Sequence, residues 1–416
     1  MIRRFSLYGF LKNQQYYDPF LILAFREKGL SFLSIGLLIA FREIMINVFE
    51  VPSGAVADTW GRRRSMIFSF CAYIVSFVLF GAAEGVTLLY AAMLFFAMGD
   101  AFRTGTHKAM IFTWLRLQGR ENERTRVYGF TRSWSKYGSA VSVLMSAALV
   151  LATGRYSLVF YACIIPYAAG IINFLGYPRE LEGDCGGLSV ARVAVHLKET
   201  LFESVRNKNV RRLILESMGF EGVFISAKDY LQPVLAAAAV PAAALLLTAA
   251  GLDDSQKAAL MVGPVYFVLY LLSAFASRRS HRLVERAGGE DRAAAVMWVA
   301  VMVIFALMLP SMWFGIHALI ILTFVALHVM QNLWRPVLIS RFDTYSTESQ
   351  GATVLSIENQ AKSISAMLLA PLMGWAVDSV QAGGMQSAYW PVAAIGLAVS
   401  LMFAAQVLLR KERRKP

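Results

Sequence analysis

Ionisable and aromatic side chains recur at helix-turn spacing inside the long apolar stretches of this chain. Between residues 86 and 115, Asp100, Arg103 and His107 lie three and four positions apart, and Trp114 follows two turns later. Residues at this spacing share one face of a helix. An ionisable group at the centre of a bilayer costs at least about 2.5–3.5 kcal/mol, so such a face is expected to line a protein interior or a hydrated path. The chemistry that fits is the binding of a charged solute and the exchange of protons.

Several carboxylates lie at a depth where a proton could be taken up from one side and released to the other. A carrier that uses a proton gradient needs a carboxylate whose protonation differs between its two states. Glu43, Asp100 and Glu221 lie near mid-depth of their apolar stretches, and two others come next. The predicted proton-coupling residues are therefore Glu43, Asp100, Glu221, Glu358 and Asp229.

Basic, polar and aromatic side chains in the same stretches are expected to line a substrate cavity. Their basic excess favours an organic anion or zwitterion over a lipophilic cation as the substrate. For each residue the alternative is a satisfied ion pair, such as Asp100 with Arg103 or Glu358 with Lys362. The predicted cavity residues are Gln15, Tyr16, Tyr17, Asn47, Arg103, His107, Trp114, Lys228, Gln232, His328, Asn332, Arg335 and Lys362.

The composition places these residues in a membrane protein. The chain has 416 residues, of which 57% are hydrophobic and 16% charged, with a mean hydropathy of +0.54. Soluble domains average about 45–50% apolar and about 25% charged residues. Ser65–Ala83, Ala293–Met312 and Pro391–Leu409 carry no charge, and about 20 apolar residues suffice to cross a bilayer as a helix. These numbers exclude a soluble enzyme, a disordered protein and a secreted disulfide scaffold.

The apolar stretches predict an all-α membrane protein with twelve spans in two six-helix bundles. We expect a first bundle over residues 1–177, a cytoplasmic linker with an amphipathic helix over 178–209, and a second bundle with a basic tail over 210–416. The predicted spans are 5–27, 31–55, 65–84, 86–115, 127–152, 156–177, 210–237, 258–277, 293–313, 315–340, 350–378 and 387–410.

The distribution of Lys and Arg over the connections predicts the orientation. With a cytoplasmic N-terminus, roughly 27 basic residues fall on the cytoplasmic side and about four outside, as the positive-inside rule requires. Both termini are then cytoplasmic, and the membrane is the cytoplasmic (inner) membrane. The net charge of +13 is accounted for by these connections and does not indicate nucleic-acid binding. Every third span (the third, sixth, ninth and twelfth) is free of charge in its membrane portion, which predicts that these four face lipid.

The connection after the second span carries a specific motif. It reads Gly54-Ala-Val-Ala-Asp58-Thr-Trp-Gly61-Arg62-Arg63-Arg64. Glycines permit a tight reversal, and arginines hold a loop at the anionic inner leaflet. The motif closely resembles the Gly-x-x-x-Asp-x-x-Gly-Arg-Arg signature of the major facilitator superfamily. Together with the span layout, linker and charge pattern, the resemblance covers essentially the whole chain.

The resemblance implies two six-helix halves that bind substrate between them near the midplane and rock in alternating access. The first, fourth, seventh and tenth helices would line the cavity. It also implies that Gly54, Asp58, Gly61, Arg62 and Arg63 form a conformational gating segment on the cytoplasmic side. The equivalent segment 277–292 of the second half keeps the basic character and lacks the Asp-x-x-Gly core, which puts a second-half lock in doubt.

The sequence therefore predicts a secondary active transporter, in which proton-coupled efflux of a small drug-like organic solute is preferred. Proton-coupled uptake of a nutrient or siderophore-like anion, and export of a metal ion on the same fold, are the alternatives. A non-transporting sensor is disfavoured by the lack of a long cytoplasmic domain. The five histidines lack metal-ligand spacing, and His-Glu-x-x-His and Gly-x-Ser-x-Gly do not occur. We expect no enzyme activity, no cofactor and no resident metal; the expected partners are the bilayer, a small-molecule substrate and protons, with the protein acting as a monomer.

Overall fold

The computed structural model describes residues 1–104, 106–120, 123–182, 206–245, 251–345, 351–384 and 388–413. These residues form helices and short connections, without a strand among them. Ten helices in this part of the chain are long and apolar enough to cross a membrane by length and composition, and a shorter apolar helix covers Trp390–Gln406. The predicted all-α membrane fold is confirmed. The amphipathic helix predicted within the linker lies outside the described residues.

The chain forms two compact units. Unit 1 comprises Met1–Lys28, Phe41–His196 and Leu246–Tyr270, and unit 2 comprises Gly29–Ala40, Leu197–Leu245 and Leu271–Pro416. Two long helices, α3 (Phe32–Trp60) and α12 (Asp254–Ala287), contribute residues to both units. The boundaries at 177 and 209 divide the chain into consecutive segments, and this division stays a prediction.

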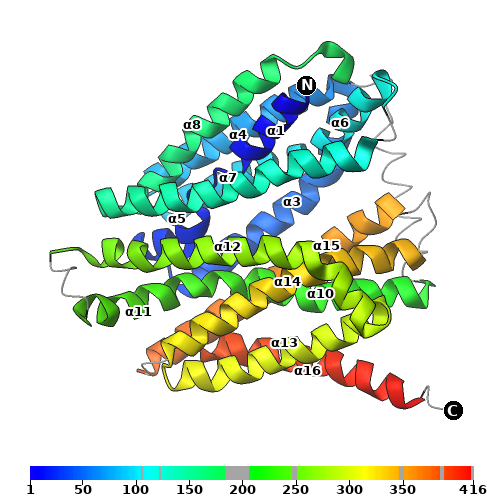
Figure 1. Cartoon of the computed structure of the whole chain (residues 1–416). Coiled ribbons are helices and arrows are strands. Elements are labelled where there is room, and N and C mark those ends of the chain that lie inside the picture. The colour runs from blue at the N-terminus through cyan, green and yellow to red at the C-terminus, as the bar shows by residue number, and fades with distance from the viewer. Residues whose placement is uncertain are drawn as a thin grey trace. The chain divides into compact units, whose positions relative to one another are not determined.

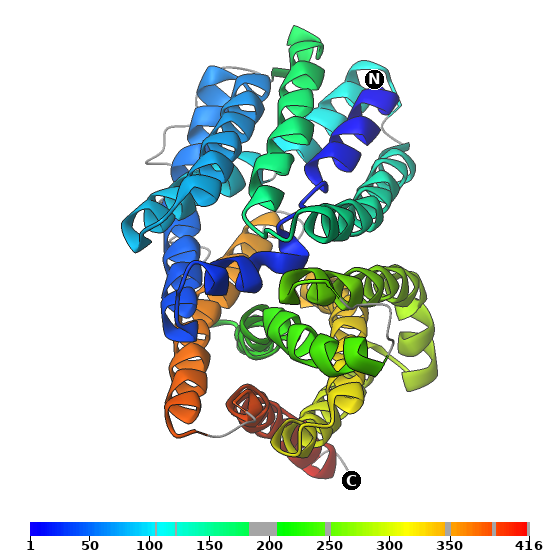
Figure 2. The ribbon, with the colours of Figure 1, turned by 90° about the vertical axis from the view of Figure 1, so that its left-hand side faces the viewer.

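Unit 1 is built around α4 (Figures 1 and 2). In it α4 packs against α5 and α8, and α1 packs against α7 and α8. Its remaining helices are α2 and α6, and a 3-10 turn, η1, joins α1 to α2. Their bounds are α1 Ile2–Lys12, η1 Asp18–Phe20, α2 Leu21–Glu27, α4 Arg62–Ala82, α5 Val86–Arg103, α6 Thr106–Leu117, α7 Arg124–Thr153, α8 Leu158–Leu175 and η3 Arg179–Glu182.

Unit 2 repeats this kind of packing with different helices. Here α10 packs against α14, α15 and α16, and α13 packs against α14 and α16. The bounds are α10 Lys208–Ala227, η4 Lys228–Tyr230, α11 Leu231–Leu245, α13 Glu290–Trp313, α14 His317–Tyr345, α15 Gly351–Ala382 and α16 Trp390–Arg413.

Three predicted spans are interrupted helices. The first is divided by residues 13–20, which include η1, into α1 and α2; the fourth is divided into α5, which ends at Arg103, and α6, which begins at Thr106; and the seventh is divided by η4 into α10 and α11. At each interruption polar residues replace apolar ones. Interrupted membrane helices are tolerated where they line a cavity, because the freed backbone groups find partners there. These three helices are among the four that the resemblance places at the cavity.

The connection that carries the loop motif is shorter than the sequence predicts. Helix α3 continues to Trp60 and α4 begins at Arg62, so a single residue makes the reversal. Gly61 has a φ of 97°, a conformation that side chains with a Cβ rarely adopt. Gly54 lies inside α3 and takes no part in the turn.

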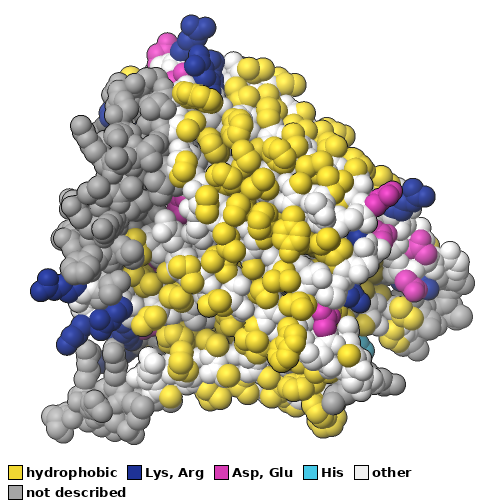
Figure 3. Space-filling view, turned by 180° about the vertical axis from the view of Figure 1, so that it is seen from behind, with side chains coloured by type: hydrophobic (Ala, Val, Ile, Leu, Met, Phe, Trp, Pro, Cys, Tyr) yellow, Lys and Arg dark blue, Asp and Glu magenta, His cyan; other side chains and the backbone are white. Residues whose placement is uncertain are grey.

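Large apolar side chains cover the outer surface of the helices. On the four helices predicted to face lipid, Phe68 of α4, Ile165 of α8, Val303 of α13 and Met402 of α16 are all exposed. Figure 3 shows one side of the molecule, where hydrophobic side chains make up most of the described surface and charged side chains lie mainly toward its margins. A surface of this kind is stable in hydrocarbon and not in water.

Several helix ends are fixed by side chains. Asp253 precedes α12 and accepts hydrogen bonds from the Ser255 hydroxyl at 2.6 Å and the Gln256 amide at 2.8 Å. These bonds lower the pKa of the Asp253 carboxyl, the one from Ser255 most. The first two amides of α3, those of Phe32 and Leu33, donate to the two carboxylate oxygens of Asp378 at 3.0 and 2.7 Å. Helix α15 thereby caps the N-terminus of α3, whose amides and dipole favour an anion.

Two glycines let α3 approach α15 closely beside this cap. A Cβ built on Gly374 of α15 would lie 2.2 Å from the Phe32 carbonyl oxygen, and one on Gly36 of α3 would lie 2.4 Å from the Ala370 carbonyl oxygen. Both distances are far below van der Waals contact, and the opposing atoms belong to the backbone. Glycine is therefore required on both sides of this crossing.

We expect Gly374→Ala to destabilise unit 2 by about 1–3 kcal/mol, because the added methyl group forces the two helices apart. The free energy of unfolding in detergent, followed by circular dichroism against a denaturant, measures the loss. Gly129→Ala in α7 is the matched control, since nothing lies within 4 Å of its Cβ position. Equal stability of the two variants would contradict the close crossing.

Candidate functional site

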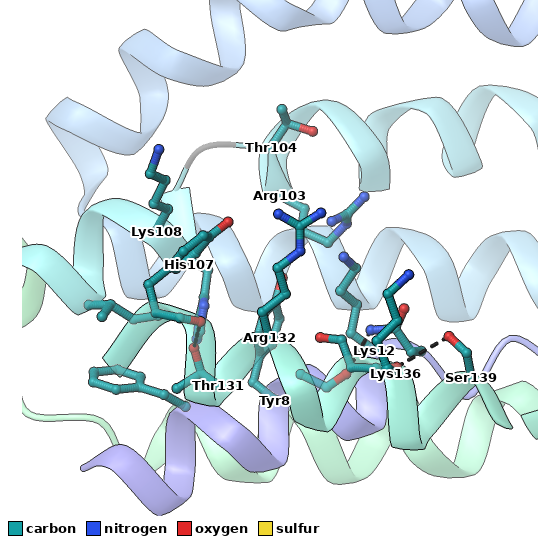
Figure 4. Close-up of a pocket in the computed structure, with 16 residues that line it drawn as sticks. Tyr8, Lys12, Arg103, Thr104, His107, Lys108, Thr131, Arg132, Lys136 and Ser139 are labelled. Atoms are coloured by element: carbon teal, nitrogen blue, oxygen red, sulfur yellow. Dashed lines mark hydrogen bonds between the residues drawn. The ribbon is translucent and has the colours of Figure 1, made fainter. Parts of the chain in front are cut away.

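Unit 1 contains a cavity of about 410 Å³ between α1, the α5–α6 break and α7. Figure 4 shows side chains from these elements directed into one space. The volume lies in the range of small-molecule sites. The lining residues are Phe5, Tyr8, Gly9, Lys12, Asn13, Arg103, Thr104, His107, Lys108, Ile111, Tyr128, Thr131, Arg132, Ser135, Lys136 and Ser139.

The charge of this cavity is positive. Its lining contains Lys12, Arg103, Lys108, Arg132 and Lys136, and none of the described lining residues is acidic. Arg103 alone has a carboxylate partner among the described residues: its Nη2 lies 2.7 Å from Asp100 Oδ1. An uncompensated group of cations is stable only when anions or water reach it. The cavity therefore has the electrostatics of an anion site.

Helix periodicity explains how α7 contributes to the cavity. Arg132 and Lys136 are four residues apart, and Thr131, Ser135 and Ser139 follow the same spacing, so they share one face of the helix. The threonine hydroxyl donates to the Tyr128 carbonyl at 2.9 Å, and the Ser139 hydroxyl donates to the Ser135 carbonyl at 3.2 Å. Because these hydroxyl hydrogens are engaged, the charged nitrogens are the main donors that α7 offers to a ligand.

An aromatic wall fixes His107 at the edge of the cavity. Its ring stacks on Tyr8 with centroids 3.7 Å apart and meets Phe5 edge-on at 5.5 Å. Its Nε2 lies 3.3 Å from the Tyr177 hydroxyl. His107 is 9% exposed. Neighbouring side chains therefore cover most of its ring, and only a small part of it faces the cavity.

The structure brings two of the thirteen predicted cavity residues, Arg103 and His107, into this cavity. Trp114 packs instead on Phe5, with ring centroids 5.9 Å apart, and does not line it. Tyr17 is buried between Phe77, Phe96 and Phe160. Gln15 and Tyr16 are also absent from the lining, although the Tyr16 carbonyl accepts a hydrogen bond from Ser146 at 2.7 Å.

Most of the residues that line the cavity are not among those predicted from the sequence. Lys12 belongs to a polar interruption of its apolar stretch, and Arg132 and Lys136 lie nearer the cytoplasmic end of their predicted span than its middle. The signal that could have found them is the four-residue spacing of cations and hydroxyls on one face of α7. The residues missed are Phe5, Tyr8, Gly9, Lys12, Asn13, Thr104, Lys108, Ile111, Tyr128, Thr131, Arg132, Ser135, Lys136 and Ser139.

Unit 2 holds a second polar cluster, formed by α10, α14 and α15. Arg335 binds Glu358 through two nitrogens, at 2.6 and 3.0 Å, and Ser217 donates to the same carboxylate. Glu358 is fully buried. Its ion pair is with Arg335 of a neighbouring helix, and the alternative pairing with Lys362 one turn along its own helix is not the one observed.

Glu221 of α10 differs from the other predicted proton-coupling residues. It is 4% exposed, its Oε2 accepts a hydrogen bond from Gln331 at 3.3 Å, and its Oε1 has no partner among the described residues. The other four carboxylates each have a cation at 2.6–2.7 Å: Arg42 for Glu43, Arg103 for Asp100, Lys228 for Asp229 and Arg335 for Glu358.

The remaining predicted cavity residues of the chain are engaged in local contacts. Asn47 donates to the Glu43 carbonyl at 2.8 Å, and Asn332 donates to the His328 carbonyl at 2.9 Å. His328 lies 2.8 Å from the Phe324 carbonyl through Nδ1. Gln232 is buried, and Lys362 is half-buried in α15. Their predicted role in substrate binding stays a prediction.

The predicted gating segment makes ordered contacts within unit 1. Arg62 donates to the Thr113 hydroxyl at 2.9 Å, and Arg63 pairs with Glu182 at 3.1 Å while donating to the Tyr177 carbonyl at 3.2 Å. The side chain of Asp58 lies outside the described part of the structure. The arginines thus join α4 to α6 and to the segment after α8.

Metal ligands do not assemble in the described part of the chain: no group of three or more His, Cys, Asp or Glu residues is close enough there to hold an ion. The five cations of the unit 1 cavity would also repel a metal ion. The arrangement fits an organic ligand that carries negative charge.

Comparison with known proteins gives one consistent family. The family model described as Major Facilitator Superfamily matches residues 13–353. An uncharacterised MFS-type transporter of Bacillus subtilis (strain 168), YxaM, is 33% identical over 229 residues, which are 53% of this chain and 54% of the relative. The chain therefore spans about half the length of this curated relative.

Solved structures share the fold at low sequence identity. The nucleoside transporter NupG matches with a TM-score of 0.77 and 13% identity, covering 98% of this chain and 98% of that one. A D-xylose-proton symporter matches with a TM-score of 0.67 and 14% identity, covering 96% and 95%. At this level of identity the similarity concerns the fold and not the substrate.

Proposed function

Because this chain belongs to the major facilitator superfamily, and is thus a multi-pass membrane transporter of some solute, we propose that it carries a small organic anion by alternating access, coupled to protons. We place it in the cytoplasmic membrane with both termini in the cytoplasm. Efflux is the proposed direction.

The observation that carries the proposal is the unit 1 cavity, with five basic side chains and no acidic one in its described lining. A cavity of this charge disfavours lipophilic cations and metal ions, since like charges repel. Phe5, Tyr8 and Ile111 add apolar surface, which suits the carbon skeleton of an organic ligand. An organic anion satisfies both features.

Glu221 supports the proton-coupled form of the proposal. Glu221 is buried, forms no ion pair with a described residue and leaves one oxygen unpaired, so its charged form is disfavoured, and Arg335 and Lys362 offset only part of this cost. We propose that Glu221 is protonated in this state and that a state that wets it or brings a cation closer releases the proton. The other four candidates already have cations at 2.6–2.7 Å, and Glu221 has no ion pair among the described residues.

The membrane potential supports efflux over uptake. Moving one negative charge outward across an inside-negative membrane releases about 2.3 kcal/mol per 100 mV. Uptake of an anion must overcome the same free energy unless at least one proton enters with each negative charge. The two directions are separated by the sign of the gradient that accelerates transport.

The test uses the full chain in proteoliposomes, with p-aminohippurate and succinate as anionic probes and tetraphenylphosphonium and Mn²⁺ as cationic ones. We expect anion flux well above that of protein-free liposomes, a change in rate with an imposed proton gradient, and no cation flux. Lys12→Gln in the cavity should lower the anion rate by about tenfold, the equivalent of 1.4 kcal/mol.

Arg155→Gln is the matched control, since Arg155 is exposed and lies outside the cavity lining. Its anion flux should equal that of the unmodified protein. Flux of tetraphenylphosphonium or Mn²⁺ in place of the anions would refute the proposal, and so would anion flux that Lys12→Gln leaves unchanged.

A further inference from the structure

We infer that the unit 1 cavity selects organic anions that carry at least two negative charges, such as a dicarboxylate or a phosphate monoester. The inference rests on the proposed function, because it specifies the charge of the anion carried at that same site. It follows from the number of cations in the cavity, their separation and the geometry of their donors.

The charge balance of the cavity leaves several cations without a counter-charge. Asp100 offsets Arg103, whereas Lys12, Lys108, Arg132 and Lys136 form no ion pair with a described residue. A singly charged ligand would offset one of these four. Each further negative charge offsets one more cation and reduces the repulsion among those that remain. A multiply charged anion is therefore the better complement.

The cations are distributed over the length of the cavity. In Figure 4, Lys108 and His107 lie at one end of the labelled side chains, Lys136 and Ser139 at the other, and Arg132 lies between them. A ligand with a single small anionic group reaches one part of this row. A ligand with two anionic groups reaches more of it, and a single group of double charge near Arg132 offsets two positive charges at one point.

The donor geometry favours oxygen anions. The guanidinium of Arg132 presents paired N–H donors that match the two oxygens of a carboxylate or phosphate. The lysine ammonium groups act as point charges with freely rotating donors. Neutral donors contribute less, since the hydroxyls of Thr131 and Ser139 already donate to backbone carbonyls. Recognition then depends mainly on charge, and affinity should fall with each charge removed.

Lys108 marks the limit of the site toward α6. Its ammonium lies 5.5 Å from the centre of the Phe112 ring and 5.7 Å from that of Tyr128. Cation–π contacts of this kind are worth about 0.5–1 kcal/mol at exposed sites and leave the charge of the ammonium uncompensated. These contacts hold the Lys108 side chain at the cavity, where its ammonium can pair with an anionic ligand.

The test measures equilibrium binding to the full-length protein in nanodiscs at constant ionic strength. Succinate, succinamate and succinamide form a series of similar size with two, one and no negative charges. Glycerol phosphate and glycerol form a second series. We expect the dissociation constant to rise by at least about tenfold for each charge removed from the succinate series.

Variants of cavity residues test whether the charge dependence of binding arises in this cavity. Arg132→Gln and Lys136→Gln should each weaken binding of succinate or glycerol phosphate about tenfold and should change succinamate binding by about twofold or less. Arg155→Gln, outside the lining, should change neither. If glycerol phosphate binds more tightly than succinate, the preferred ligands are phosphate monoesters; if succinate binds more tightly, they are dicarboxylates. Either order supports the inference.

Failure of the inference differs from failure of the proposed function. If succinamate binds as tightly as succinate, and the variants affect both equally, the site takes anions without regard to a second charge, and the inference is wrong while anion transport stands. If none of the anions binds in either series, both are wrong.

Discussion

Glu221→Gln should abolish the response of transport to a proton gradient and leave anion binding in the unit 1 cavity unchanged. Glutamine keeps the size of the neutral acid and the contact with Gln331, and it cannot release a proton. One unit of pH difference supplies about 1.4 kcal/mol per proton, a tenfold driving ratio. We expect the ratio of initial rates with and without this gradient to fall from several-fold to about one. Flux measurements in proteoliposomes, at constant membrane potential, give this ratio directly.

Glu285→Gln provides the control for this experiment, because Glu285 is an exposed carboxylate near the end of α12 and also belongs to unit 2. Its rate ratio should match that of the unmodified protein. A Glu221→Gln protein that keeps the full response would place the proton elsewhere, and Glu43, Asp100, Asp229 and Glu358 would then be tested in the same way.

Arg341→Met should destabilise unit 2 by about 3–5 kcal/mol, the usual cost of removing one partner from a buried ion pair. The Arg341 side chain is 1% exposed and lies 2.7 Å from Glu216, which is 3% exposed in turn. It also lies 2.8 Å from Asp291. Methionine fills similar volume but leaves the Glu216 carboxylate with Arg212 as its remaining cation. Denaturant unfolding in detergent measures the change.

Two further variants test whether the loss of stability comes from the ion pair itself. Arg282→Met removes an exposed arginine of unit 2 and should change stability by about 0.5 kcal/mol or less. The double replacement Glu216→Gln with Arg341→Met removes both charges and should recover much of the loss. A single Arg341→Met variant as stable as Arg282→Met would show that the buried network contributes little.

This network also bears on the second half of the chain, where segment 277–292 lacks the Asp-x-x-Gly core. Arg341 and Asp291 join the C-terminal part of α14 to the start of α13, and Glu216 joins both to α10. These contacts order that end of unit 2 through residues other than a loop motif.

Much of the fold could be predicted from the sequence because bilayer thickness and helix geometry fix the length of an apolar span. Uncharged stretches such as Ser65–Ala83 correspond to single helices in the structure. The interruption after Lys12 is visible in the sequence as a polar run, yet the prediction places it within one span. Hydropathy averages over about 20 residues, so it cannot separate an interrupted helix from a continuous one.

The site was harder to predict because sequence spacing reports neighbours along one helix only. The Asp100–Arg103 pair, three residues apart, was among the alternatives and is observed. Glu358 pairs with Arg335 across two helices, which no spacing within α15 reveals. The cations of α7 join Lys12 of α1 in the cavity for the same reason: their proximity is a property of helix packing.

The bond between Asp378 and the first amides of α3 has a consequence for biosynthesis. Its partners are 345 and 346 residues apart in the chain, so the ribosome must synthesise all the residues between them before the carboxylate exists. Until then the start of α3 has to rely on water or lipid headgroups for its free N–H groups. The α3–α15 junction is thus among the last parts of unit 2 to mature, and a nascent chain stalled before residue 378 would expose it to quality-control proteases.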